Sequence, residues 1–337
     1  MTESLADHEF AEALASIDAE GSTELEKVEM LVEIAMRLQH KPRSVDQLRQ
    51  AVELYDAALA RAAASEPLLE ARIRARKATA LSAIPDSGAE HLPLARSELE
   101  RALPVLLERG SAEEGAEAEL NLGLVTQSLA ALGRAKITDA ISAYQRAIRV
   151  FSRDRHATEY AILHNNLATA YLSIPMSDER GRMREALAVQ SFEEALNVVT
   201  LVDNPTEYAM LQNNLGNALQ YAASGHPLDN NLRALRAYDA ALKVRTARDT
   251  PVEYANTLAN KANCLRNLPD DAERPRAGNR GRLAESATLY REARAIYLRF
   301  GALAQAELVG EALTDVEREL APARTAVAEP DFGEPRI

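Results

Sequence analysis

Small and apolar residues recur along this chain with a long and regular period. A small residue in one predicted helix is followed, 16 to 24 positions later, by the first residue of an apolar stripe in a second predicted helix. This two-helix unit returns every 43 to 48 residues. A period of this length is typical of helical solenoids, whose units bury their apolar faces against neighbouring units. The pattern therefore predicts an all-α stack of about six two-helix repeats. The small residues that mark the first helices are Ala35, Ala78, Gly123, Ala168, Gly216 and Ala262.

The second stripe has its own signature. A small residue is followed four positions later by an aromatic residue or Leu, and three positions after that by Ala. These offsets place the three side chains on one face of a helix, where alternating small and large residues let neighbouring helices interlock. The signature predicts core packing at Ala51, Tyr55, Ala58; Ala95, Leu99, Ala102; Ala140, Tyr144, Ala147; Ala188, Phe192, Ala195; Ala234, Tyr238, Ala241; and Ser286, Tyr290, Ala293.

Both ends of the array depart from the repeat. The signature occurs once upstream, at Phe10, Ala13 and Leu14, so we expect a lone N-terminal capping helix in residues 1–22 and the six repeats in residues 23–300. Residues 301–320 are helical in pattern but fit the repeat poorly, as expected of a C-terminal capping helix. Residues 321–337 carry three prolines and little apolar content, which predicts a disordered tail.

The connections between helices are of two kinds. Those between one repeat and the next keep a nearly constant length, whereas those inside a repeat vary. Variable loops gather on one edge of a solenoid, which marks that edge as tolerant or as functional. The longest, residues 267–282, is rich in arginine. It is either a solvated loop or a partner contact.

Composition narrows the classes of function. The chain has 39 Lys and Arg against 51 Asp and Glu, a formal charge of -12, which argues against nucleic acid or an anionic membrane as a partner. Its one cysteine, Cys264, excludes an internal disulfide and a thiolate metal cage. The chain starts without a basic or apolar leader and has no apolar run long enough for a membrane span. We therefore expect a cytoplasmic protein.

Residue patterns typical of enzymes are missing from the sequence. The six histidines form no HExxH pair, and neither a glycine-rich phosphate loop nor a nucleophile elbow occurs. Cys264 falls on the small, packed face of a first helix, where an inert buried thiol is expected. The sequence therefore predicts a protein without catalytic residues, cofactor or metal.

Two segments resemble the tetratricopeptide repeat. Leu167-Ala-Thr-Ala-Tyr171 with the following second helix fits that pattern, as does Leu215-Gly216. The strings HNNLA and QNNLG, beginning at His164 and Gln212, resemble the long repeats of kinesin light chains and bacterial scaffolds, although Trp is absent, Lys261 replaces an expected Leu and the loops within repeats are longer. The resemblance implies a right-handed superhelical solenoid whose first helices line a concave groove that binds a partner segment.

Four asparagines recur two positions before the small residue of a first helix, at Asn121, Asn166, Asn214 and Asn260. Asn is a poor helix former, so this asparagine ladder needs a reason beyond propensity. The resemblance implies that such an Asn binds the backbone of an extended peptide, because a carboxamide both donates and accepts hydrogen bonds. The alternative is that each Asn bonds a neighbouring repeat or caps a connection.

Further residues share the face of the ladder. The apolar Ile162 and Met210 belong either to the groove wall or to the core. The polar candidates for peptide binding are Asn165, Thr169, Asn213, Asn217, Asn256 and Asn263.

The first two repeats carry charge at the corresponding positions. Glu29 and Glu33 in the first correspond to Arg72 and Arg76 in the second. We expect Glu29 to pair with Arg72 and Glu33 with Arg76, each contributing ~0.5 kcal/mol if exposed. The alternative is that the two arginines bind a carboxylate of a partner.

These observations favour a non-catalytic scaffold that binds a segment of an unidentified partner protein in the groove, centred on Asn166, Asn214 and Asn260. A second hypothesis is an assembly factor or structural adaptor that acts through its loop edge or by self-association. A third is a sensor that binds a small ligand in the groove.

Overall fold

The structure is a computed structural model that describes residues 22–62, 66–85, 90–174, 179–222 and 226–321. Within these ranges the chain forms thirteen α-helices and one short 3-10 helix, and no strand. This confirms the all-α prediction. The predicted N-terminal capping helix and nearly all of the predicted tail lie outside the described residues. The chain divides into two compact units, Met1–Val199 and Thr200–Ile337.

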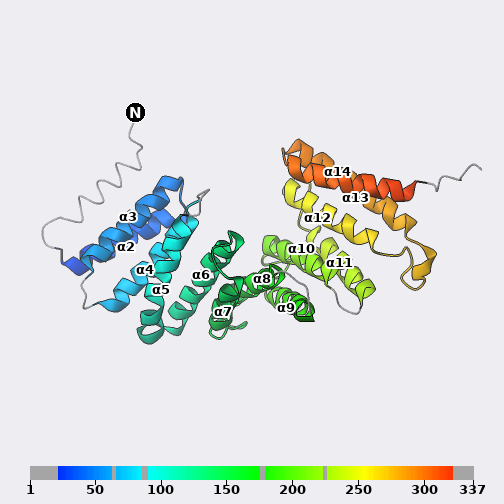
Figure 1. Ribbon diagram of the computed structural model, residues 1–337. Coiled ribbons are helices and arrows are strands. Elements are labelled where there is room, and N and C mark those ends of the chain that lie inside the picture. The colour runs from blue at the N-terminus through cyan, green and yellow to red at the C-terminus, as the bar shows by residue number, and fades with distance from the viewer. Residues whose placement is uncertain (1–21, 63–65, 86–89, 175–178, 223–225, 322–337) are drawn as a thin grey trace, which may run out of the picture. The chain divides into compact units, whose positions relative to one another are not determined.

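The described part of the first unit contains four helix pairs that follow one another in chain order (Figure 1). Each helix packs against the next, and the first helices of neighbouring pairs also contact one another in turn. The pairs are α2 (Glu24–His40) with α3 (Val45–Arg61), α4 (Pro67–Ala83) with α5 (His91–Arg109), α6 (Ala112–Ala131) with α7 (Ile137–Ala147), and α8 (Ala157–Leu172) with α9 (Glu179–Leu196).

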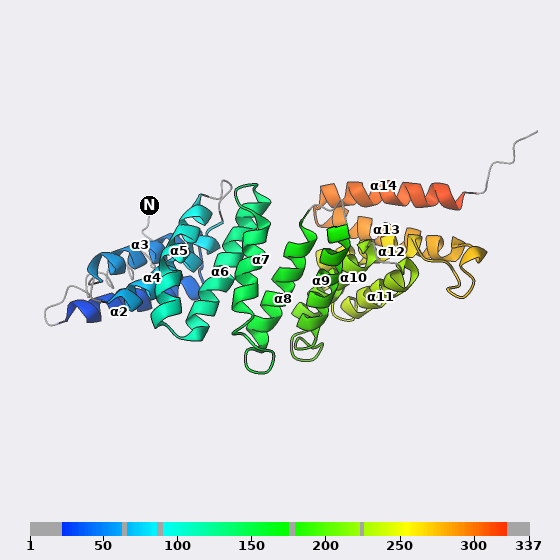
Figure 2. The same ribbon diagram turned by 60° about the horizontal axis from the view of Figure 1, so that its bottom comes forward.

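The second unit continues the same arrangement with two pairs and a last helix. The pairs are α10 (Pro205–Tyr221) with α11 (Pro227–Ala241) and α12 (Pro251–Arg266) with α13 (Arg280–Arg299), and the short helix η1 (Pro275–Ala277) lies in the loop before α13. The last helix, α14 (Leu303–Leu320), packs against α13, as Figure 2 shows.

The two apolar stripes predicted from the sequence form the core. All six small residues of the first helices are buried, and no residue of the second-helix signature is more than 3% exposed. The prediction of core packing is therefore confirmed. Glycine is required where a tyrosine ring lies directly against the first helix, because a Cβ at Gly216 would lie 2.5 Å from Cε1 of Tyr238. Gly123 faces the ring of Tyr144 in the same way.

The turns that precede α10 and α12 are closed by the same pair of hydrogen bonds, between a Thr and the Asp three positions later. The hydroxyl of Thr200 donates to Oδ2 of Asp203 at 2.6 Å and accepts from the backbone N–H of that residue at 3.0 Å. Thr246 and Asp249 repeat this pair of bonds at 2.8 and 3.0 Å. A turn that is closed on itself has a fixed length, which accounts for the equal spacing at these two connections.

The arginine-rich loop of residues 267–282 is held at both ends. The carboxylate of Asp270 accepts hydrogen bonds from the backbone N–H groups of Gly281 and Arg282, at the start of α13. Arg280 donates to the backbone carbonyl of Leu320 at the end of α14, at 2.7 Å. Asp270 therefore closes the loop onto the start of α13, and Arg280 joins α13 to the end of α14.

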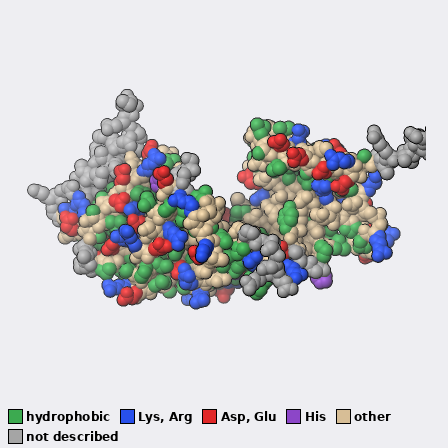
Figure 3. All heavy atoms as spheres, viewed as in Figure 1, with side chains coloured by type: hydrophobic (Ala, Val, Ile, Leu, Met, Phe, Trp, Pro, Cys, Tyr) green, Lys and Arg blue, Asp and Glu red, His purple; other side chains and the backbone are tan. Residues whose placement is uncertain are grey.

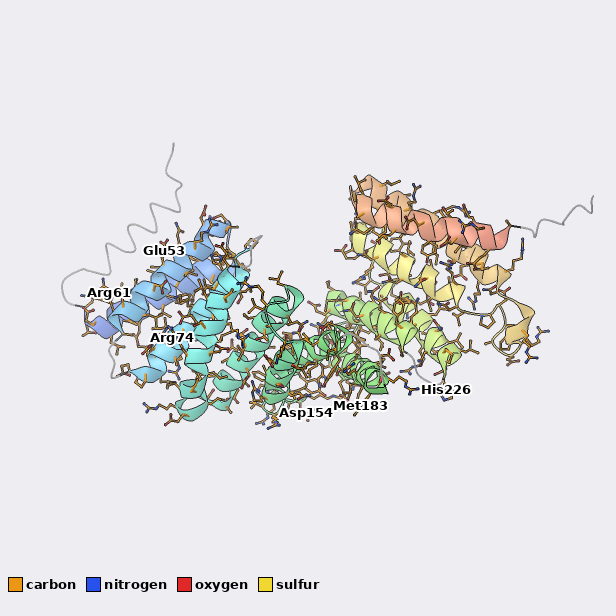
Figure 4. The ribbon with its side chains drawn as sticks, viewed as in Figure 1. Glu53, Arg61, Arg74, Asp154, Met183 and His226 are labelled. Carbon is orange, nitrogen blue, oxygen red and sulfur yellow. The ribbon has the colours of Figure 1, made fainter. Side chains whose placement is uncertain are left out.

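On two first helices, α4 and α12, a lysine forms ion pairs with acidic residues of the second helices on both sides of it. We call these two lysines, Lys77 and Lys261, the lysine braces. Lys77 on α4 bonds Asp56 of α3 at 2.6 Å and Glu98 of α5 at 3.0 Å. Arg74, labelled in Figure 4, projects from the same helix and bonds the other oxygen of Glu98 at 2.7 Å. Lys261, the departure from the expected Leu, repeats this arrangement: its Nζ lies 2.8 Å from Oδ1 of Asp239 on α11 and 3.8 Å from Oε1 of Glu285 on α13.

Candidate functional site

A hollow of about 920 Å³ opens on the face of the first unit that α2, α4 and α6 form together. A smaller hollow of about 250 Å³ shares four of its lining residues and extends it along α2 and α4. We call the larger one the N-terminal hollow. The side chains that line it are Glu33, Met36, Arg37, Gln39, His40, Tyr55, Arg72, Ala75, Arg76, Thr79, Leu106, Glu114, Glu117, Ala118 and Asn121.

An ion pair between neighbouring first helices forms part of the hollow's wall. Arg72 on α4 binds both carboxylate oxygens of Glu114 on α6, with Nε–Oε1 at 2.6 Å and Nη2–Oε2 at 3.2 Å. Glu114 is held in place because it belongs to the capping box of α6, where it accepts the backbone N–H of Ser111 at 2.9 Å. The hydrogen bonds from Arg72 and from that backbone group lower the pKa of Glu114.

The two ion pairs predicted between α2 and α4 are wrong. Arg72 turns away from Glu29 to Glu114, and Glu33 pairs with Arg37 one turn along its own helix at 2.6 Å. Arg76 forms no ion pair with any described residue, and its guanidinium lies against the sulfur of Met36. Matching height on adjacent helices was not sufficient, because Arg72 has a better-placed carboxylate in Glu114 and Glu33 pairs within its own helix.

A chain of hydrogen bonds forms the floor of the hollow. The hydroxyl of Tyr55 donates to Oε1 of Gln39 at 2.9 Å, and Nε2 of Gln39 donates to Oγ1 of Thr79 on the next first helix at 2.7 Å. Burial raises the pKa of Tyr55 to about 12, so its hydroxyl stays protonated as a donor. The floor is therefore fixed by bonds that join α2, α3 and α4.

The same chain of hydrogen bonds recurs two repeats later, between α6, α7 and α8, and includes a predicted site residue. Tyr144 donates to Gln127 at 2.8 Å, and Nε2 of Gln127 donates to Thr169 at 3.2 Å. The hydroxyl of Thr169 donates in turn to the backbone carbonyl of Asn166 at 3.0 Å. Thr169 thus joins α8 to α6 within the protein.

The ladder residues of the first unit have amide donors without partners among the described residues. Asn121 lines the N-terminal hollow and has no hydrogen bond from its side chain there. Oδ1 of Asn166 lies 3.5 Å from Nδ2 of Asn165, at the limit for a hydrogen bond. Oδ1 of Asn165 and Nδ1 of the neighbouring His164 are buried without a partner there, and burial lowers the pKa of that histidine.

In the second unit, two predicted site residues of α12 form hydrogen bonds to the neighbouring first helix α10. Nδ2 of Asn260 on α12 donates to Oδ1 of Asn213 on α10 at 3.1 Å. Nδ2 of Asn263 donates to the hydroxyl of Tyr221 at 2.9 Å. These contacts agree with the alternative that such residues bond a neighbouring repeat. Asn214 only accepts a marginal contact from Asn213, at 3.5 Å, so its own amide donors are available.

Two other predicted residues accept hydrogen bonds from tyrosines of second helices. The hydroxyl of Tyr238 lies 2.8 Å from Oδ1 of Asn217, and that of Tyr297 lies 2.6 Å from Oδ1 of Asn256. Both amides therefore help to seat a second helix against a first helix.

The apolar candidates on the same face are exposed. Ile162 is 40% exposed and Met210 is 38% exposed, so neither belongs to the core. They present apolar surface beside the ladder, on the first and the second unit respectively.

Most lining residues of the hollow were not among the predicted site residues, and Met36, His40 and Glu117 are examples. Met36 and His40 lie three and seven positions after Glu33, which places them on the same helix face. Glu117 lies one turn before Asn121 on α6. The signal that identifies them is their offset from the small residue of the repeat, not their chemistry.

The described residues show no sign of a metal site or of a membrane helix. No group of three or more His, Cys, Asp or Glu side chains is placed there to share a metal ion. None of the helices in these ranges is long and apolar enough to cross a bilayer. Cys264 is buried, its thiol donates to the backbone carbonyl of Asn231 at 3.2 Å, and burial raises its pKa to about 12.

Comparison with known proteins gives a distant likeness. No protein-family model and no curated protein matches the chain. Among solved structures, the crystal structure of BtubC (BKLC) from P. vanneervenii is similar, with 22% sequence identity and a TM-score of 0.49 over 73% of this chain and 92% of that chain. The description of the chain as a helical-repeat protein rests on its own helix packing.

Proposed function

We propose that this chain is a non-catalytic, tetratricopeptide-like scaffold that binds a segment of a partner protein in the N-terminal hollow. One observation carries the proposal: Arg76, which forms no ion pair with a described residue, and Asn121, whose side chain forms no hydrogen bond with one, both line a hollow of about 920 Å³. Its floor is fixed by the Tyr55–Gln39–Thr79 hydrogen bonds. A preformed polar surface of this kind loses little entropy when a segment binds.

The proposal places the binding surface nearer the N-terminus than the asparagine ladder alone suggests. Asn213, Asn260 and Asn263 take part in hydrogen bonds within the second unit, so their amides are less available to a ligand. Asn121, Asn166 and Asn214 have amide donors without a partner among the described residues. Of these three, Asn121 is the one that lines the hollow.

Filling the hollow without changing its charge tests the proposal. Ala75 lies on α4 among the lining residues, and Ala75→Phe should block the hollow. Ala259 occupies the same position relative to the small residue of α12 and is also partly buried, so Ala259→Phe is a matched control in the second unit. Peptides are first selected on the full chain from a phage-displayed library of random peptides, and their affinities are then measured by fluorescence polarisation.

We expect Ala75→Phe to lower the affinity at least about 10-fold, which corresponds to about 1.4 kcal/mol. Ala259→Phe should bind like the unchanged protein. Circular dichroism of both variants checks that helicity is kept. If the selected peptides bind Ala75→Phe with unchanged affinity, the hollow is not the binding surface, and the loop edge or self-association becomes the better explanation.

A further inference from the structure

Most of the Arg and Glu side chains that line the N-terminal hollow already form ion pairs with one another. Three arginines and three glutamates line it. Arg37 pairs with Glu33 at 2.6 Å, and Arg72 pairs with Glu114 through two bonds. This leaves over one arginine and one glutamate that form no ion pair with a described residue.

The cation left over is Arg76. It is exposed, and its guanidinium touches the uncharged thioether of Met36, a residue from α2 that is itself 42% exposed. A guanidinium carries five N–H donors in a planar fork whose geometry matches a carboxylate. Arg76 is therefore placed to bind an acidic side chain that enters the hollow.

The anion left over is Glu117 on α6. It is exposed and makes no ion pair with a described residue. It lies one helical turn before Asn121, so the two side chains share a face. A carboxylate accepts hydrogen bonds only, which suits a lysine or arginine of a ligand.

A uniformly acidic ligand fits this surface poorly. The lining carboxylates of Glu33, Glu114 and Glu117 balance the three arginines in number, so the arginines give the hollow no excess positive charge. Figure 3 likewise shows acidic and basic side chains interspersed over α2 to α6. Selection by charge must therefore act through local contacts and not through the net field of the protein.

We propose that the partner segment carries both an acidic and a basic side chain, the acidic one bound by Arg76 and the basic one by Glu117, with the amide of Asn121 bonding its backbone. This inference rests on the proposed function, because it specifies the ligand of the same hollow. It predicts a mixed-charge ligand, in contrast to a polyanion or a purely apolar segment.

The test is a selection of random twelve-residue peptides displayed on phage, carried out on the full chain and on three variants. Peptides selected by the unchanged protein should be enriched in both Asp or Glu and Lys or Arg, relative to the unselected library. Arg76→Glu should lose the acidic enrichment and keep the basic one, and Glu117→Lys should do the reverse. Arg248→Glu is the charge-matched control, since the Arg248 side chain is 94% exposed and lies in the second unit.

A second measurement covers the case in which a charge reversal disturbs folding. One selected peptide, labelled with fluorescein, is titrated with Arg76→Gln, which removes the charge and keeps a polar side chain. We expect its Kd to rise about 10- to 100-fold, the loss typical of one charge-assisted hydrogen-bonded contact. The melting temperature of each variant is measured alongside.

The outcomes separate this inference from the proposed function. If the selected peptides are uncharged, or keep their acidic enrichment on Arg76→Glu, while Ala75→Phe still blocks them, the mixed-charge inference is overturned and the hollow remains the binding surface. If Ala75→Phe does not block them, the proposed function fails and this inference fails with it.

Discussion

At the scale of single residues, the same amino acid has different roles in different repeats. Asn260 donates a hydrogen bond to Asn213, which is only 8% exposed, whereas Asn121 bonds no described side chain. A carboxamide can bond a neighbouring helix or a ligand equally well, so its position in the repeat does not determine its partner. The difference is therefore visible only in the structure.

Substitution of these two asparagines by alanine should have opposite effects on stability. Asn260→Ala leaves the buried oxygen of Asn213 without its donor, which costs ~1–3 kcal/mol, against a gain of up to ~0.7 kcal/mol from the better helix propensity of Ala. We expect a lower free energy of unfolding in urea. Asn121→Ala breaks no such bond, so it should be neutral or slightly stabilising.

The affinity for a selected peptide should respond to these two substitutions in the opposite order to the free energy of unfolding. Asn121→Ala is expected to weaken the binding of a selected peptide, and Asn260→Ala to leave it unchanged. Equal losses of stability in the two variants would show that Asn121 also supports the fold, which would remove it from the candidate site.

At the scale of helices, apolar patterns predicted the structure better than charges did. Position in the repeat determined which side chains are buried, because packing requires a small residue wherever a ring such as Tyr144 or Tyr238 approaches. Ion pairs were not predictable in this way. Arg72 and Glu29 share a height on adjacent helices, but the capping box of α6 holds Glu114 in a better place. Long side chains reach several partners, and the choice depends on local geometry.

The lysine brace at Lys77 holds a largely buried carboxylate, Glu98, in its charged form. The Lys77 and Glu98 side chains are 13% and 12% exposed. Burial of Glu98 acts to raise its pKa, but the hydrogen bonds from Arg74 and Lys77 outweigh this effect and lower it overall. A carboxyl with a lowered pKa stabilises the fold above its unfolded-state pKa, and this contribution is lost as the pH falls through the folded-state value.

Lys77→Met should therefore lower the free energy of unfolding by ~1–3 kcal/mol at pH 7, less than the full cost of breaking a buried pair because Arg74 remains on Glu98. The difference from the unchanged protein should begin to shrink as the pH falls below about 4.5, the unfolded-state pKa of Glu, and should be lost once the pH falls below the lowered folded-state pKa of Glu98. Urea unfolding at several pH values measures this.

Lys261→Met is the matched comparison. The partners of Lys261, Asp239 and Glu285, are 51% and 43% exposed, so its loss should cost less than ~1 kcal/mol. A difference between Lys77→Met and the unchanged protein that stays constant from pH 7 to pH 3 would rule out the role of Glu98.

At the scale of the whole molecule, two compact units divide the repeats between Val199 and Thr200. In a repeat protein each helix pair contacts only its neighbours, so stability is close to a sum of local terms. The N-terminal hollow is built entirely from α2 to α6 in the first unit. The first unit should therefore bind the partner segment without the second unit.

A fragment of residues 1–199 should fold and bind by itself, because it contains every residue of the hollow and every hydrogen bond that fixes its floor. We expect helical circular dichroism, cooperative thermal unfolding, and a Kd for a selected peptide within about three-fold of the full chain, a difference of ~0.7 kcal/mol or less. The fragment of residues 200–337 should not bind that peptide. If residues 1–199 fold but bind more than about 10-fold more weakly, the site requires the second unit, and the assignment of binding to α2, α4 and α6 alone is wrong.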